Sequence, residues 1–339
     1  MLQYIVKSVL TIATLAAVIL SPTVHAQQTG DPLTVYSGRS KSLVDPIIQQ
    51  FTRETGIEVE VRYADTSQLT VLLKEEGEQS PADVFWAQDA GALGAMVSQG
   101  GLQQLPDDVL GLVGEPYKSP DGLWVATSGR ARVLAYSPQR ISEDDLPQSI
   151  FDLTDSRYQG RVGWAPANAS FQAFVTAMRV THGEEVTRDW LESMKANGAR
   201  SYPKNTAIIQ AIAAGEVDLG LPNHYYLLRF KKSDGEYPVE QTTFATGDIG
   251  NLINVAGIGI LNTSDQPADA AKFIGFLLSP KAQQYFTSDT FEYPVTDDVI
   301  PNTQLIDPAV LNHNAPQVDL DALDDLPGTL DLLREVGLL

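Results

Sequence analysis

The stretch PLTVYSGRSKSLVDPIIQQFTRETGIEVEVRYA, residues 32–64, decides the fold class. Its first residues alternate and are rich in β-forming side chains, which predicts a strand that ends at Gly38. The next run predicts a helix, with Asp45 as the N-cap, Pro46 at the first helical position and Gly56 as the stop. The closing IEVEVRYA alternates strictly and predicts a second strand. Strand, helix and strand in this order indicate a mostly parallel sheet with helices on its faces.

The same order recurs along the chain. Strands are predicted at 82–88, 160–166 and 255–261. Helices are predicted by ranges with apolar residues at helical spacing and Gly or Pro at their ends: 67–78, 89–101, 170–183, 185–198, 205–215 and 266–286, the last broken at Pro280. The acidic tail is helical in pattern, with a break at Pro327 and Gly328. No linker separates the two α/β halves, so we expect the chain to cross between two lobes more than once.

The first 26 residues have the composition of a secretory signal peptide, with cleavage near Ala26. Lys7 is the only charged residue in this segment, and residues 8–20 are almost wholly apolar. The alternative is a retained membrane anchor, but the apolar run is short for a span of about 20 residues. We therefore expect an exported protein of about 313 residues, enough for two domains.

Composition excludes several classes of function. The chain has no cysteine, which excludes disulfides, thiolate metal sites and cysteine nucleophiles. A net charge of −20 argues against nucleic acid as a partner. The sequence has no HExxH, GxSxG, P-loop or GxGxxG motif, and its four histidines are too scattered for a histidine metal cluster. A secreted hydrolase or other enzyme is therefore disfavoured.

The sequence NHYY, residues 223–226, raises the main question about function. Asn205 is expected to cap the helix TAIIQAIAAG, and the strand EVDLGL after it ends at Pro222. A helix N-terminus and the residues after the returning strand share one edge of an α/β sheet, where ligands bind. Neighbouring residues of a strand point to opposite faces, so a plain core pair is an awkward interpretation of Tyr225 and Tyr226. Taken alone, the two tyrosines could still be structural.

Other predicted strand ends carry polar residues suited to a ligand. The loops SGRS (37–40), AQDAG (87–91) and ANAS (167–170) follow strands, and TSGRAR supplies two arginines from a strand-like segment. Together they offer amide and hydroxyl donors and cationic groups. Each of these residues also has an alternative role without a ligand. The arginines could form ordinary ion pairs, Asn205 could serve as a helix cap alone, and Gln88 and Asp89 could simply be the residues at which a helix begins.

Several stretches resemble the periplasmic ferric-iron-binding proteins of bacterial ABC transporters, which have the type 2 periplasmic binding protein fold. They are VYSGRS, PADVFWAQDAGALG, WVATSGRARVLAYS, YQGRVGWAPANASFQAFVTAMR, NTAIIQAIAAGEVDLGLPNHYY and SPKAQQYF. The resemblance covers roughly residues 33–300. It implies two α/β lobes with a mostly parallel sheet in each and a ligand cleft between them. It also implies an N-lobe of 27–130 and 256–306 and a C-lobe of 131–255 and 307–339.

The resemblance further implies that Tyr225 and Tyr226 are ligands of Fe(III). Fe(III) is hard and prefers anionic oxygen. A phenol costs about 4 kcal/mol to ionise at pH 7, which the bound cation offsets. Carbonate or a similar synergistic anion would supply further oxygens. The residues predicted to hold that anion are Arg39, Arg130, Arg132, Asn168, Ser170, Asn205 and Asn223, with Ser37, Ser40 and Gln88 as weaker members of the cleft.

The chain departs from the family pattern at three points. Some members have a His where this chain has Ser40, and a Glu where it has Gln88; another branch has a third tyrosine near Ala169 and Ser170. None of the residues present here is a good Fe(III) ligand. We therefore expect Tyr225 and Tyr226 to be the only protein ligands, with His224 a neighbour and not a ligand.

The sequence thus predicts a periplasmic solute-binding protein, not an enzyme. It would bind Fe(III) with a synergistic anion between the lobes, act as a monomer and deliver the iron to an ABC permease in the inner membrane. The alternative keeps the fold but binds an oxyanion or organic anion without metal, with the tyrosines stacking or hydrogen-bonding.

Overall fold

The computed structural model describes residues 31–300 and 302–339. Residues 31–339 form one compact unit. The expected signal peptide lies outside the described residues. Within the described part of the chain, no helix is long and apolar enough to cross a membrane.

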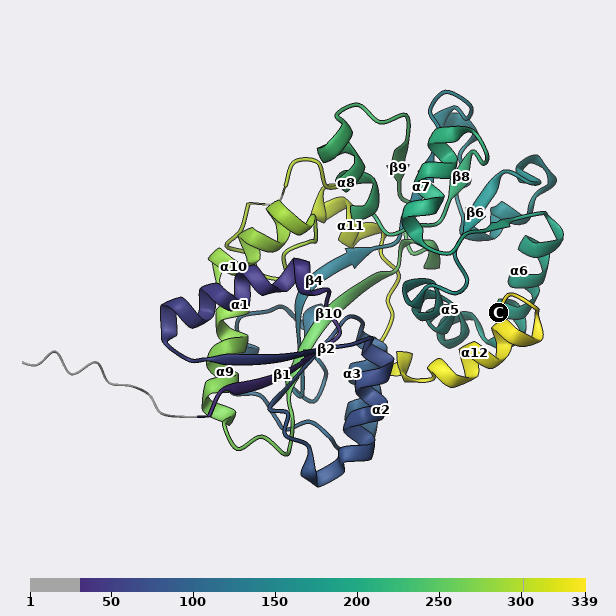
Figure 1. Ribbon diagram of the computed structural model, residues 1–339. Coiled ribbons are helices and arrows are strands. Elements are labelled where there is room, and N and C mark those ends of the chain that lie inside the picture. The colour runs from purple at the N-terminus through teal and green to yellow at the C-terminus, as the bar shows by residue number, and fades with distance from the viewer. Residues whose placement is uncertain (1–30, 301) are drawn as a thin grey trace, which may run out of the picture. The chain divides into compact units, whose positions relative to one another are not determined.

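The first sheet contains five strands and is mixed (Figure 1). In spatial order they are β2 (Val59–Tyr63), β1 (Leu33–Ser37), β3 (Val84–Ala87), β10 (Ile253–Ile260) and β4 (Val125–Ala131). β1 is parallel to β2, as the opening stretch predicted, and also to β3, whereas β10 is antiparallel to both β3 and β4. β10 comes from a part of the chain far from the others and lies between β3 and the edge strand β4.

One apolar core joins this sheet to its helices. The helices are α1 (Lys41–Thr55), α2 (Thr66–Glu76), α3 (Ala90–Ser98), α4 (Asp107–Leu110), α9 (Pro267–Leu277) and α10 (Pro280–Tyr285). Trp86 of β3 is fully buried and packs edge-on against Phe273 of α9, with ring centroids 6.0 Å apart. The expected break at Pro280 is confirmed, because the helix ends at Leu277 and a new helix begins at Pro280.

The prediction for the start of the first helix is wrong. α1 begins at Lys41, Ser40 is its N-cap and Pro46 lies inside it. The buried face of the helix already includes Val44, upstream of the proline, so tertiary burial extends the helix in the N-terminal direction. A proline inside a helix removes one backbone hydrogen bond, which the burial of this face outweighs. The stop at Gly56 is confirmed, with φ of 76° and its N–H bonded to the carbonyl of Thr52.

The second sheet is also mixed and has its own cores (Figure 1). Its strands in spatial order are β7 (Arg200–Ser201), β6 (Val162–Trp164), β8 (Leu219–Gly220), β5 (Leu134–Tyr136) and β9 (Glu240–Thr242). The helices that contribute to these cores and to a smaller cluster beside them are α5 (Ala169–His182), α6 (Glu184–Ala196), α7 (Asn205–Ala214), α8 (Tyr225–Asp234), α11 (Pro308–Asn314) and α12 (Leu326–Glu335). The expected α/β architecture with two sheets is therefore confirmed, but neither sheet is mostly parallel. β10 in the first sheet and β5 in the second are antiparallel to both of their neighbours.

The C-terminal segment contacts elements of both sheets. A short 3₁₀ helix, η8 (Asp321–Asp324), packs on α3, and α12 packs on α5. The Trp124 indole N–H donates to a carboxylate oxygen of Asp321 at 2.6 Å, and Leu323 is buried in a core of the second sheet. The backbone approach to α3 is close: a Cβ added at Gly94 would lie 2.4 Å from the carbonyl oxygen of Asp321.

Gly94→Ala therefore tests how closely η8 packs on α3. Alanine favours a helix over glycine, but here its methyl group would push the backbone of η8 away. We expect a net loss of about 1–3 kcal/mol in the free energy of unfolding, measured by urea denaturation. Gly275→Ala in α9 is the matched control, because a Cβ there has no atom within 4 Å. That variant should gain about 0.5–1 kcal/mol. Equal effects from both variants would contradict the close packing.

Candidate metal and anion site

The tyrosine pair lies at the start of a helix. Tyr225 and Tyr226 are the first residues of α8, so the argument from opposite faces of a strand does not apply to them. Both belong to the first helical turn, and their rings lie 4.3 Å apart between centroids with an interplanar angle of 36°. Just before them, Asn223 forms an isolated antiparallel bridge with Arg132. This bridge brings the pair next to the segment that leaves β4.

The two phenols line a small cavity of about 100 Å3. Its lining comes from the ends of β3, β4 and β10, from the N-terminus of α5 and from the start of α8. The lining residues are Gln88, Asp89, Arg130, Arg132, Asn168, Ala169, Ser170, Asn223, Tyr225, Tyr226, Leu252 and Asn254. Three of the segments expected at strand ends, 87–91, 127–132 and 167–170, therefore meet around one space, whereas 37–40 does not line it.

Two buried arginines in this lining have no carboxylate partner among the described residues. Arg130 and Arg132 are each about 3% exposed. Arg130 donates to the backbone carbonyls of Gln88 and Val255, and Arg132 donates to those of Ser170 and Leu221. Carbonyl groups satisfy hydrogen bonds but do not neutralise the two positive charges.

Arg132 is further enclosed by aromatic rings. Its guanidinium carbon lies 5.4 Å from the ring centroid of Phe171 and 4.9 Å from that of Phe174. Burial lowers the pKa of Arg132 to about 9, against the opposing effect of the two tyrosines. The group is still protonated at neutral pH, so the cavity keeps its positive charge.

Burial also affects the ionisation of Tyr226. It raises the pKa of Tyr226, and the neighbouring phenol of Tyr225 raises it further. The amide of Asn205 and the guanidinium of Arg229 act in the opposite direction, and Arg229 lies over both tyrosine rings at 4.8 and 5.9 Å. Without a metal the phenol of Tyr226 is therefore neutral at pH 7, and ionisation requires a cation close to its oxygen.

Asp89 lines the cavity, although the sequence did not mark it as a binding residue. It does cap α3, where its Oδ1 accepts from the N–H of Ala92 at 3.2 Å, but it also lines the same space as the phenols. Burial raises the pKa of its carboxyl, while Arg130 and the helix N–H groups oppose this. Its position directly after a buried strand was the available signal, and it was the same signal that selected Gln88.

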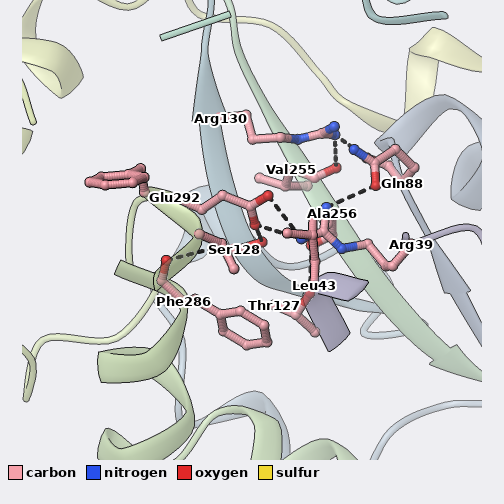
Figure 2. Close-up of polar contacts among 12 residues, drawn as sticks. Arg39, Leu43, Gln88, Thr127, Ser128, Arg130, Val255, Ala256, Phe286 and Glu292 are labelled. Atoms are coloured by element: carbon pink, nitrogen blue, oxygen red, sulfur yellow. Dashed lines mark hydrogen bonds and ion pairs between the residues drawn. The ribbon is translucent and has the colours of Figure 1, made fainter. Parts of the chain in front are cut away.

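Arg39 lies elsewhere than expected. It does not line the small cavity, and its Nη2 is 2.7 Å from Oε2 of Glu292 (Figure 2). Both side chains of this ion pair are almost fully buried. Ser37 is buried behind Arg39, and its Oγ accepts from the Arg39 backbone N–H at 3.2 Å. Ser40 is exposed and lies at the start of α1. These three predicted positions are therefore not part of the cavity wall.

Asn205 is not a helix cap. It is the first residue of α7, Lys204 precedes it as the N-cap, and the Asn205 side chain makes no capping hydrogen bond. Its Nδ2 instead donates to Oδ1 of Asn168 at 3.1 Å and to Oγ of Ser170 at 3.2 Å. Asn205 is fully buried, and its Oδ1 accepts from none of the described residues. It thus holds two polar side chains of the cavity in place.

His224 has both ring nitrogens occupied. Nδ1 accepts from the N–H of Ala131 at 3.1 Å, so the proton resides on Nε2, which donates to the carbonyl of Phe291 at 2.7 Å. Burial lowers the pKa of His224 to about 4. The histidine next to Tyr225 is therefore a neutral structural link between β4 and the 291–293 segment. Across the described residues, no three His, Asp or Glu side chains gather in a way that could hold a metal ion.

Residues 79–324 match the family described as bacterial extracellular solute-binding protein. The chain belongs to this family. The solute-binding protein also shares 33% identity over 311 residues with the major ferric iron-binding protein of Neisseria meningitidis, covering 90% of this chain and 93% of the relative. The resemblance predicted from the sequence is confirmed, and the relatives are solute-binding proteins rather than enzymes.

Solved structures agree in fold. Iron-bound HitA from Pseudomonas aeruginosa superposes on this solute-binding protein with a TM-score of 0.84 at 34% identity, over 91% of this chain and all of HitA. A Trichodesmium protein solved with iron and citrate gives a TM-score of 0.80 at 28% identity, again over 91% of this chain and all of the other. The expected binding-protein fold is thus confirmed.

The Arg39–Glu292 pair predicts a large effect on stability when one member is removed. Glu292→Gln leaves the charge of Arg39 buried without a counter-charge, and we expect the free energy of unfolding to fall by about 3–5 kcal/mol. The double variant Arg39→Met with Glu292→Met removes both charges at similar volume and should lose far less. Urea denaturation measures both. If the double variant is as unstable as Glu292→Gln, the pair contributes through packing and not through charge.

Proposed function

We propose that this chain binds Fe(III) together with a small anion in the cavity at Tyr225 and Tyr226, and delivers the iron to an ABC permease. One observation carries the proposal: two adjacent phenols share a cavity of about 100 Å3 with two buried arginines that lack carboxylate partners. Phenolate is a favoured ligand type for Fe(III), and unpaired buried guanidinium groups favour an oxyanion. The relatives named for ferric iron support the choice of metal.

Charge counting supports the presence of the anion. Fe(III) with two phenolates retains one positive charge, and Arg130 and Arg132 add two more. The carboxylate of Asp89, if ionised, removes one. A buried site with this excess is unfavourable unless another negative group enters. Carbonate or a similar multivalent oxyanion would provide that charge and fill iron positions that the tyrosines leave open. The citrate in the Trichodesmium structure supports an organic oxyanion as another candidate.

The protein groups have separate roles in this mechanism. Tyr225 and Tyr226 release their protons to solvent as the metal binds, since the cation lowers the pKa of each phenol. Arg130 and Arg132 hold the anion, and Asn205 donates to Oδ1 of Asn168, which leaves the Asn168 amide nitrogen to donate to the anion. The hydroxyl of Ser170 donates to the same Oδ1 at 2.6 Å and so helps to hold Asn168 in place. Because these residues come from elements of both sheets, the ligand would favour a closed arrangement of two lobes with the predicted boundaries. Export to the periplasm through the N-terminal segment completes the proposal.

Colour is the direct test of the tyrosine ligands. Ferric citrate with bicarbonate, added to the metal-free protein, should produce a visible tyrosinate-to-iron charge-transfer band. Tyr225→Phe and Tyr226→Phe should each weaken the band, and the double variant should show none, because phenylalanine offers no oxygen. Tyr237→Phe is the control, since Tyr237 stacks on Phe230 and does not line the cavity. A colourless wild type that binds an anion tightly without metal would favour the alternative function.

Asp89→Asn tests the carboxylate of the cavity. Asparagine keeps the cap of α3 but removes one negative charge, so the melting temperature should hold while Fe(III) affinity falls. We expect a loss of about ten-fold, the effect of roughly 1.4 kcal/mol of attraction in a partly screened site. Competition with a chelator measures it. Asp307→Asn is the matched control, because Asp307 caps α11 and does not line the cavity. An unchanged affinity in Asp89→Asn would remove the carboxylate from the site.

A further inference from the structure

We propose that Gln88 donates a hydrogen bond to the anion, and that the buried Arg39–Glu292 pair fixes it in this orientation. Gln88 would then be a specificity-determining residue for oxyanions and not a ligand of the iron. The inference rests on the proposed iron and anion site. It assigns separate roles to Arg39 and Gln88, both of which the sequence placed in the anion-binding cleft.

The orientation of the Gln88 amide follows from its partner. Nη1 of Arg39 lies 2.8 Å from Oε1 of Gln88. A guanidinium group has only donors, so the atom that meets it must be the amide oxygen. The oxygen is therefore occupied by Arg39, and among the described residues the side chain of Gln88 has no other hydrogen-bond partner, so Nε2 is free to donate. Gln88 also lines the small cavity, which leaves the Nε2 hydrogens for a ligand there.

The side chain of Arg39 is held in this orientation by a second partner. Its Nη2 lies 2.8 Å from Oε1 and 2.7 Å from Oε2 of Glu292, and both side chains are almost fully buried. Burial alone would raise the pKa of Glu292, but Arg39 and Arg130 hold it below its usual value. Ser128 of β4 donates to the same carboxylate. These contacts hold the pair in place next to Gln88, and Figure 2 shows them.

The surroundings of Gln88 favour an anion over a cation. Figure 2 places Gln88 between the guanidinium groups of Arg39 and Arg130, and Arg130 donates to its backbone carbonyl. Both oxygens of Gln88 thus accept from arginines, and a metal ion approaching either one would meet a positive charge. An oxyanion in the cavity would instead receive donors from Gln88, Arg130 and Arg132.

A larger cavity next to the first gives the anion a route to Gln88. It measures about 730 Å3 and shares Gln88, Asp89, Asn168 and Ala169 with the small one. Gln88 therefore stands where the two spaces join. Gln88 at this junction can donate to an oxyanion that enters from the larger cavity. The same hydrogen bond can persist when the anion reaches Arg130 and Arg132.

The test separates an anion donor from an iron ligand by using inorganic phosphate as the probe. Metal-free protein receives a fixed amount of Fe(III), and the charge-transfer band is recorded while phosphate is titrated. Gln88→Met keeps the side-chain length but cannot donate. We expect the phosphate concentration at half-maximal colour to rise about ten-fold, the usual effect of losing one charge-assisted hydrogen bond. The band at saturating phosphate should keep its position and intensity, because the iron ligands are unchanged.

Two further variants complete the design. In the Arg39→Met, Glu292→Met double variant, Gln88 is present but no longer held, so the half-maximal phosphate concentration should rise in the same direction by a smaller factor. Circular dichroism confirms that this variant folds. Gln172→Met is the matched control, because Gln172 lines only the larger cavity and should leave the titration unchanged.

Each result has a definite meaning. A shift of less than two-fold in Gln88→Met would overturn the inference. So would a weaker or displaced band at saturating phosphate, because that would make Gln88 an iron ligand. A wild type without any band at any phosphate concentration would instead refute the proposed iron site itself, which keeps the two failures distinct.

Discussion

The pairing of β10 with β3 and β4 is the constraint on which the site depends. β10 enters the first sheet from the second half of the chain and runs antiparallel between two strands of the first half. β4 leaves the same sheet at Ala131, and β5 of the second sheet begins at Leu134. The chain therefore passes between sheets at one place in both directions. Arg130, Arg132 and Asn254 reach the cavity because they lie at this passage.

Around that passage, buried charges divide into two kinds. Arg39 meets Glu292 and forms a closed pair that stabilises the backbone around it. Arg130 and Arg132 donate hydrogen bonds to backbone carbonyl oxygens and form no ion pair within the described part of the chain, so an anion from outside can serve as their partner. The metal-free cavity is thus cationic although the chain carries a net charge of −20. Such a local reversal of sign attracts anions to a protein that would otherwise repel them.

Much of the fold could be predicted because its signals are local. Strand alternation and glycine stops report on the residues that carry them, and Gly56 ended its helix as expected. The predictions failed where contacts between residues far apart in the sequence determine the local structure. Burial of Val44 moved the start of α1, and contacts with Asn168 gave Asn205 a role other than capping. Tyr225 begins a helix that follows the two-residue strand β8 after a short connection. No local pattern encodes those partners.

The candidate site shows the same limit more sharply. Arg39, Arg130 and Arg132 look equivalent in the sequence, as three arginines near strand ends. What distinguishes Arg39 is Glu292, 253 positions further along the chain and brought to it only by the fold. A binding arginine is recognised by the counter-charge it lacks, and a structural one by the counter-charge it has. That difference depends on the folded interior. The sequence could therefore identify the three arginines as candidates, but it could not tell the structural arginine from the two that line the cavity.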